Sequence, residues 1–182
     1  MRNGAAIVLV MLGLVLGGSS PVAAEIEGIR LEVDGLSCPF CALGLDKRLK
    51  ERAGLEQIQI HLKQGETEAS LPTGEGLDIG RLRLAIQEAG FTLRSIRLSV
   101  TGTVVRDGGY LAVASRGDGT RFLLFDAEHQ EAGSGPVLSE RLQRQLEQAE
   151  RTAGLLRISG TVHEHAGLPP AIMMEAVEEL SE

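Results

Sequence analysis

The residues best suited to chemistry in this chain are its two cysteines, which lie in the segment Cys38-Pro39-Phe40-Cys41. An alternating apolar run precedes them and a run with helical periodicity follows, so the spacing predicts two thiols at the start of a helix. Amide donors and the helix dipole lower the pKa of a thiol placed there, which supplies thiolate. Two thiolates three positions apart can hold one soft metal ion or form one small disulfide. The sequence leaves both chemistries open.

The first half of the chain carries strand and helix patterns in the order βαββαβ. Apolar residues recur at every second position in the strand-like segments and at three- or four-residue spacing in the helix-like ones. We expect strands over residues 29–33, 57–62, 67–71 and 91–100, and helices over 40–53 and 79–89. Gly54 is a helix stop, and Asp78 can cap the second helix. This order predicts a ferredoxin-like βαββαβ sandwich.

The second half of the chain has a different sequence pattern, in which glycine-rich turns separate short runs of residues that favour strands. We expect strands over residues 96–106, 110–115, 120–126, 155–163 and 171–180, and a helix over 139–152. Three strands, a helix and two strands is the order of a five-stranded OB-type barrel. Gly102 and Gly160 lie inside the first and fourth strands, where glycine permits a bend or a close backbone approach. The last run follows two prolines and is rich in Glu, so a helix over 172–180 is the alternative.

The loop from Gly35 to Cys41, in the sequence Gly-Leu-Ser-Cys-Pro-Phe-Cys, resembles that of the heavy-metal-associated domain family, and the resemblance covers roughly residues 27–100. The family includes copper chaperones, the amino-terminal modules of copper-transporting ATPases and the periplasmic mercury-binding protein. The resemblance implies that Cys38 and Cys41 bind Cu(I) or Hg(II), for transfer or detoxification. Together with the second half, it predicts an α+β protein: a ferredoxin-like βαββαβ sandwich followed by a small OB-like β-barrel domain.

Two residues outside the cysteine pair bear on this resemblance. Leu36 stands where the family usually has a Met that is buried under the loop. Phe91 falls in the short loop that often carries an aromatic residue or Lys near the metal. We expect Phe91 to be a core aromatic residue with one edge near the cysteine loop, and not a metal contact.

The chemistry of the two ligands agrees with the metal interpretation. Thiolates are soft and select Cu(I) and similar ions over Mg or Ca. A pair of ligands leaves the ion open to a third ligand from another protein, which suits transfer to a membrane metal transporter or an acceptor protein. A structural zinc site usually has four ligands. His61 is expected on the outer face of its strand, so no further ligand is predicted nearby.

Two other interpretations of the cysteine pair stay open. The first is an exported thiol-disulfide redox protein, because Cys-Pro-Phe-Cys also resembles the glutaredoxin sequence. That fold continues with a strand, a helix and a hairpin introduced by a cis-Pro, whereas here a hairpin follows directly and Pro72 ends it. The second is an interaction module with a structural disulfide. No Ser/His/Asp arrangement, phosphate loop or matched pair of carboxylates indicates an enzyme.

The amino terminus predicts export. One positive charge at Arg2 precedes an apolar run over residues 5–16, and small residues ending at Ala24 follow. This is the order of a secretory signal peptide over residues 1–24, and the apolar run is shorter than the roughly 20 residues of a membrane span. We therefore expect a periplasmic or secreted protein that touches the membrane only if this segment stays uncleaved. The remaining chain divides into a heavy-metal-associated domain over 25–98 and an OB-like domain over 99–182.

Other candidate ligands and partners are weaker. His163-Glu164-His165 could bind a metal, but we expect a short polar turn there. Met173 and Met174 carry soft thioethers, and adjacent strand residues face opposite ways, so one of them is expected in the core. The net charge is −7, with only four Phe, one Tyr and no Trp. Because nucleic-acid binding depends on Lys and Arg neutralising phosphates, this composition argues against a nucleic-acid partner.

Overall fold

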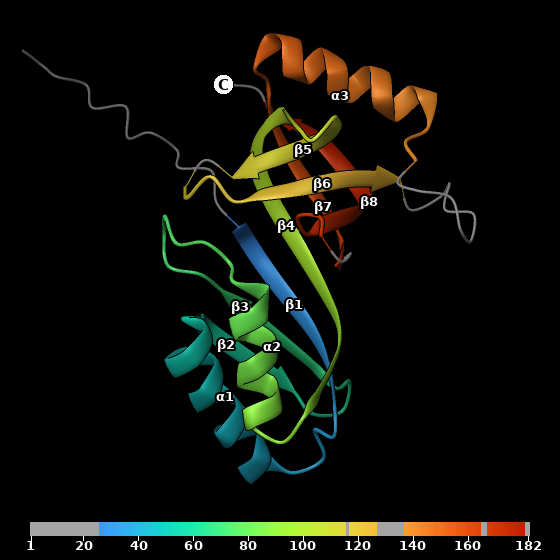
Figure 1. Ribbon diagram of the computed structural model, residues 1–182. Helices are drawn as coiled ribbons and strands as arrows, with labels where there is room; N and C mark the ends of the chain where they lie inside the picture. Colours follow the sequence, from blue (N-terminus) through green and yellow to red (C-terminus); the bar gives the residue numbers. More distant parts are fainter. Residues whose placement is uncertain (1–25, 116, 127–136, 165–166, 181–182) are drawn as a thin grey trace, which may run out of the picture.

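The computed structural model describes residues 26–115, 117–126, 137–164 and 167–180, and the strands in these ranges form a single sheet (Figure 1). The strands are β1 (Ile26–Asp34), β2 (Glu56–His61), β3 (Glu66–Ser70), β4 (Thr92–Asp107), β5 (Tyr110–Ser115), β6 (Arg121–Asp126), β7 (Leu155–His163) and β8 (Ala171–Leu180). The helices are α1 (Pro39–Ala53), α2 (Ile79–Glu88) and α3 (Glu140–Thr152). The order of the strands in the sheet is β2-β3-β1-β4-β5-β6-β8-β7.

Five of these strands close into a barrel. β4, β5, β6, β8 and β7 follow one another around it, and a β4–β7 pairing completes the circle. β6 and β8 run parallel, and the other neighbours in the barrel run antiparallel. α3 connects β6 to β7 and buries Leu146 and Ala149 in the main core. This closed barrel is compatible with the OB-like architecture that the sequence predicts.

The predicted fold class is wrong for the first half of the chain. The protein is mostly β, and β1, β2 and β3 are three outer strands of the barrel's own sheet, so the molecule is not a ferredoxin-like sandwich followed by a barrel. The element order βαββαβ does occur, but its last strand does not end at Val100. β4 runs for sixteen residues, pairing with β1 along its first part and with β5 along its second.

The physical reason lies in the sequence of β4. After Val100 the residues Thr101, Thr103 and Val104 continue to favour a strand, and no turn residue other than Gly102 interrupts them. The strand therefore continues past the glycine instead of ending near Val100. One continuous core follows, because buried side chains beneath α1 and inside the barrel belong to the same cluster. The boundary expected between residues 98 and 99 falls inside this strand.

The two strand glycines allow close backbone approach, as the sequence predicts. A Cβ atom on Gly102 would clash with the carbonyl oxygen of Ala114 on β5, and one on Gly160 would clash with that of Met173 on β8. The run after Pro170 is strand β8, so the helical alternative for residues 172–180 is excluded.

A polar network joins the outer strands to the barrel. The carboxylate of Glu27 on β1 accepts hydrogen bonds from the Thr101 hydroxyl at 2.7 Å and from Arg157 Nε on β7 at 2.8 Å. Arg157 also lies 3.4 Å from Glu178 on β8. Burial alone would raise the pKa of Glu27, but the hydrogen bonds from Arg157 and Thr101 and the charge of Arg157 outweigh it and lower that pKa. The same contacts raise the pKa of Arg157.

Helices α1 and α2 cover one face of the outer strands (Figure 1). Leu45 and Leu49 of α1 and Leu82 and Ile86 of α2 are buried in the main core, as the helical spacing of the sequence predicts. Among the described residues, no helix has the length and apolar character needed to cross a membrane. The predicted signal segment, residues 1–24, lies outside the described ranges.

Candidate thiol site

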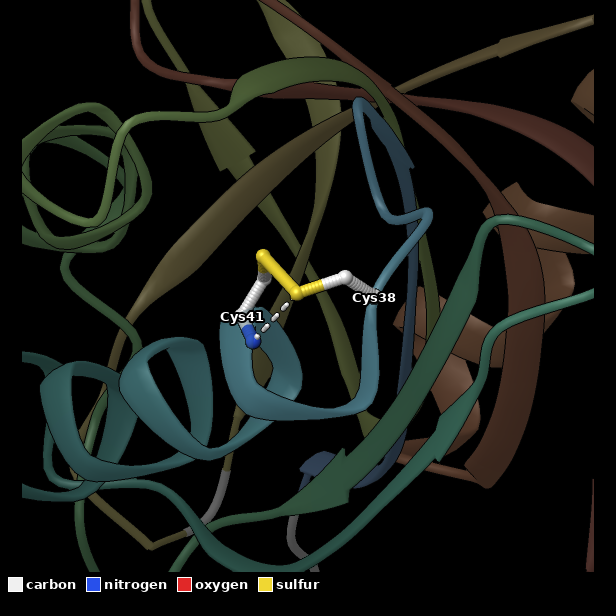
Figure 2. The surroundings of a disulfide bond; sticks show 2 residues. All are labelled: Cys38 and Cys41. Atoms are coloured by element: carbon white, nitrogen blue, oxygen red, sulfur yellow. Dashed lines mark hydrogen bonds between the residues drawn. A yellow bond between two sulfur atoms is a disulfide. The ribbon is translucent and has the colours of Figure 1, made fainter.

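Both cysteines lie at the start of α1, where the sequence predicts them. Cys38 is the residue before the helix, with extended backbone angles, and Pro39 occupies the first helical position, where its missing N–H costs nothing. Figure 2 shows the sulfurs of Cys38 and Cys41 joined as a disulfide on this first turn. The Cα atoms are 5.3 Å apart. Neither described cysteine is a free thiol in this structure.

The helix terminus provides a favourable setting for negative charge on sulfur. The backbone N–H of Cys41 donates to Cys38 Sγ over 3.2 Å (Figure 2). The first turn of α1 contains no acidic residue, and Lys50 and Arg52 lie in the last turn. The helix dipole and the amide donor therefore act in the same direction and stabilise a thiolate at position 38 when the pair is reduced.

The loop before the cysteines is held by a glycine and an aromatic ring. Gly35 has a φ of +94°, a region that other residues rarely adopt, and a Cβ there would lie 3.3 Å from the Phe91 ring. Phe91 is partly buried against the main core, which confirms the expected core aromatic beside the loop. Leu36 is buried in the same core, as expected for the position at which the family has Met.

Exposed apolar residues lie next to the cysteines in sequence, at the start of α1, and sequence reasoning did not predict their exposure. Phe40 is 84% exposed and Leu43 is 67% exposed, and exposed Pro39 adjoins them. We call Pro39, Phe40 and Leu43 the apolar rim. The helical spacing could have predicted this exposure, because Leu45 and Leu49 form the buried stripe of α1 and residues 40 and 43 fall outside that stripe.

Several charged residues of α1, β1 and β4 are paired with one another. Lys50 Nζ lies 2.9 Å from Asp46, and Arg94 lies 3.6 Å from Asp34. Another exposed pair, Lys47 with Glu51, continues along the helix.

The other predicted ligands lie elsewhere. Within the described ranges, no group of three or more His, Cys, Asp and Glu side chains could hold a metal ion. His61 is on β2, 4.0 Å from Glu68, and its neighbour Ile60 packs on the core, so alternation turns His61 to the outer face as expected. The structure does not bring His61 to the thiols.

The carboxyl-terminal candidates are also separated from the cysteines. His163 is exposed at the end of β7, Glu164 pairs with Arg83 of α2, and His165 lies outside the described residues. Met174 is buried in the main core, and Met173 is buried in a second cluster that contains Phe125. Both thioethers are thus packed inside the protein, whereas the sequence predicted only one of them in the core.

Comparison with known proteins adds no relative. No family model, no curated protein and no solved structure matches this chain. The resemblance to the heavy-metal-associated domain family therefore stays a prediction from the cysteine loop and its surroundings.

Proposed function

We propose that the protein, after reduction of its disulfide, binds one soft metal ion, Cu(I) or Hg(II), between the sulfurs of Cys38 and Cys41. The observation that supports this is the convergence of both sulfurs on one exposed helix terminus, with an amide donor aimed at one of them. Soft thiolates select soft ions, and the helix terminus favours the charged form that binds them. The ion is cargo of the protein and not a structural part of its fold.

The surroundings of the pair favour transfer over permanent storage. The described residues place no third acidic, His or Cys ligand in a cluster with the two sulfurs. The coordination of the ion is then completed by a partner's ligand, and the apolar rim gives that partner a surface to cover. A membrane metal transporter or a soluble acceptor with a cysteine of its own fits this chemistry. The proposed compartment is the periplasm or the exterior of the cell.

A second function, thiol-disulfide exchange, is favoured by the disulfide itself. A substrate thiolate would attack one sulfur of the Cys38–Cys41 bond, form a mixed disulfide and release the other cysteine as a thiolate. The second substrate thiol would then displace the mixed disulfide. Two electrons pass from the substrate dithiol, which becomes a disulfide, to the protein, which is left with two thiols.

Metal titration of the reduced protein tests the main proposal. Cys38→Ser and Cys41→Ser should each remove most high-affinity binding of Cu(I) in competition with a chelator, while His163→Ala should bind like the wild type. One equivalent of Cu(I) or Hg(II) should also protect both thiols from alkylation. Tight stoichiometric binding by the double serine variant would contradict the proposal.

A disulfide-reduction assay separates the two functions. Insulin reduction by the reduced protein should be negligible if the thiols serve to bind metal. Catalytic turnover of insulin disulfides, together with unprotected cysteines in the presence of metal, would replace the metal proposal by the redox one.

A further inference from the structure

A groove of about 450 Å³, lined mainly by polar residues, lies across the outer strands and the adjoining parts of β4 and β7, on the face opposite α1 and α2. We call it the polar groove. Its floor consists of small residues from four strands: Gly28, Ser70, Ser99 and Ser159. These residues alternate with buried neighbours such as Ile29 and Leu98, which point into the core on the helix side. The Ser159 hydroxyl donates to Ser99 Oγ over 3.2 Å, so hydroxyl groups from β4 and β7 meet on the floor.

Two irregularities of the sheet border this groove. The pairing of β1 with β4 shifts register between Ile26 and Gly28, and that of β2 with β3 shifts between Glu56 and Gln59. A bulge re-aims the side chain of its extra residue and is frequent beside binding sites.

Of the three residues inside these two shifts, Glu27 and Gln57 line the groove, and Ile58 packs on the core. Gln57 has a φ of +48°, a strained value for a residue with a side chain. Two independent backbone distortions therefore converge on one surface.

The wall of the groove contains two arginines that face each other on neighbouring strands. Arg30 on β1 lies directly opposite Arg97 on β4 in the strand register. Like charges at such positions destabilise a sheet, because their side chains are close neighbours. Glu68 accepts from Arg30 at 2.7 Å on one flank, and Glu175 accepts from Arg97 at 3.2 Å on the other. The two arginines therefore occupy the middle of a row of charged side chains that runs from Glu68 on β3 to Glu175 on β8.

We propose that this groove binds a small polar ligand that carries a carboxylate or phosphate group, held by Arg30 and Arg97. Each guanidinium has five N–H donors in a planar fork, so each keeps donors for an oxyanion after pairing with one glutamate. The body of the ligand lies over the serine floor toward the amide of Gln57. The lining contains no aromatic residue, so the groove offers no stacking surface for a nucleobase.

Glu68 and Glu175 at the two flanks neutralise the charges of Arg30 and Arg97, and this limits the expected affinity for an anion. Because the anion meets a pair of arginines whose charge is already balanced, we expect a dissociation constant on the order of 1 mM. The site is independent of the cysteines, since none of its lining residues belongs to the thiol loop.

Gly28 provides a variant that blocks the groove. A Cβ at this position meets no atom within 4 Å, and the φ of Gly28 is outside the left-handed region, so the side chain of Gly28→Val starts in open space on the floor of the groove. Valine also suits a strand better than glycine. Arg97→Gln removes one of the two anchors. Arg144→Gln on α3 is the matched control, because Arg144 is exposed, does not line the groove and pairs with Glu140 in the same helix.

The experiment is a titration of the ¹⁵N-labelled full-length protein followed by its amide spectrum. Inorganic phosphate and succinate are the two probes, with sodium chloride at equal ionic strength as the blank. We expect saturable shifts of the Gly28, Ser99 and Ser159 amides with at least one probe, and the probe that acts tells phosphate from carboxylate recognition. Gly28→Val should abolish these shifts, Arg97→Gln should weaken binding about tenfold, and Arg144→Gln should change nothing.

Two results would overturn the proposal. One is the absence of saturable shifts with either probe up to about 20 mM, well above the expected dissociation constant. The other is unchanged binding by a folded Gly28→Val protein, which would place the anion elsewhere on the surface. The amide spectrum itself reports whether each variant is folded.

Discussion

The outer strands and the barrel use the two faces of their common sheet in different ways. In the outer strands, α1 and α2 cover one face, and the other presents Arg30, Glu68 and their polar neighbours. In the barrel, the inward face joins the main core, and outward residues such as Leu123 and Phe125 are buried in a second cluster. The chemistry of the molecule therefore gathers on the half with an open face. The cysteine pair lies on this half, and the polar groove extends from it onto the adjoining strands β4 and β7.

The two regions therefore differ in their structural roles. The barrel closes its backbone hydrogen bonds around a circle and leaves the sheet no edge there, so it forms a closed base for the outer strands. The outer strands extend from that base along β4 and β1 (Figure 1). We infer that the barrel fixes the position of strands whose loops and faces meet ligands.

The largest expected effect lies in the barrel, at Gly160. In Gly160→Ala the new methyl group would meet the backbone carbonyl of Met173, which cannot rotate away. We expect a loss of about 3 kcal/mol in the free energy of unfolding, as in other overpacked sites. Urea unfolding followed by circular dichroism measures it.

The matched substitution in the outer strands is Gly28→Ala, where the methyl group enters open space. It should leave the free energy of unfolding unchanged or raise it by about 0.5 kcal/mol, because alanine loses less chain entropy than glycine. Equal destabilisation by the two substitutions would show that the barrel is no more tightly packed than the outer strands.

The sequence predicts local elements well and long-range pairing poorly, and particular residues show why. The strand expected at 110–115 is observed with those limits as β5, and α1 begins at Pro39 and ends before Gly54, whose φ is +69°. Proline, glycine and apolar spacing act within a few residues, so they can be seen in one chain without a partner.

The mistaken fold class has a long-range cause. Whether β4 ends near Val100 or continues depends on β5 and β7, which lie downstream and pair with its second part. The two bulges of the groove are likewise differences in register between strands, and Arg30 meets Arg97 across 67 positions of chain only because β1 and β4 pair. The cysteine site was predictable because both thiols lie within one turn.

A smaller effect is expected where the two regions meet, at Glu27. Since folding lowers the pKa of Glu27, its charge stabilises the folded protein at pH values above the unfolded pKa, about 4.3 for a free glutamate. That stabilisation fades as the pH falls through the lower pKa of the folded state. We expect Glu27→Gln to cost at most about 1 kcal/mol at pH 7, because the partly exposed pair is screened by water.

The pH dependence is the decisive measurement for Glu27. The difference in unfolding free energy between wild type and Glu27→Gln should be constant near neutrality and shrink in acid. Arg94→Gln, which removes an exposed pair with Asp34 away from the junction, is the control. A difference that grows as the pH falls would contradict the direction given for the pKa.

The smallest effect on stability is expected at Phe40, beside the thiols. Its ring is 84% exposed, whereas Phe122 inside the barrel is fully buried. A phenylalanine therefore packs in the core of one region and faces solvent in the other. Phe40→Ser should change the free energy of unfolding by less than about 0.5 kcal/mol, as surface substitutions do. Cu(I) affinity of the reduced protein should also stay near the wild-type value, because the ring supplies no ligand. A large loss of either quantity would mean that Phe40 folds over the ion or the loop. If both are retained, the apolar rim stabilises neither the fold nor the bound ion, and its exposed area is free for the partner that completes the coordination.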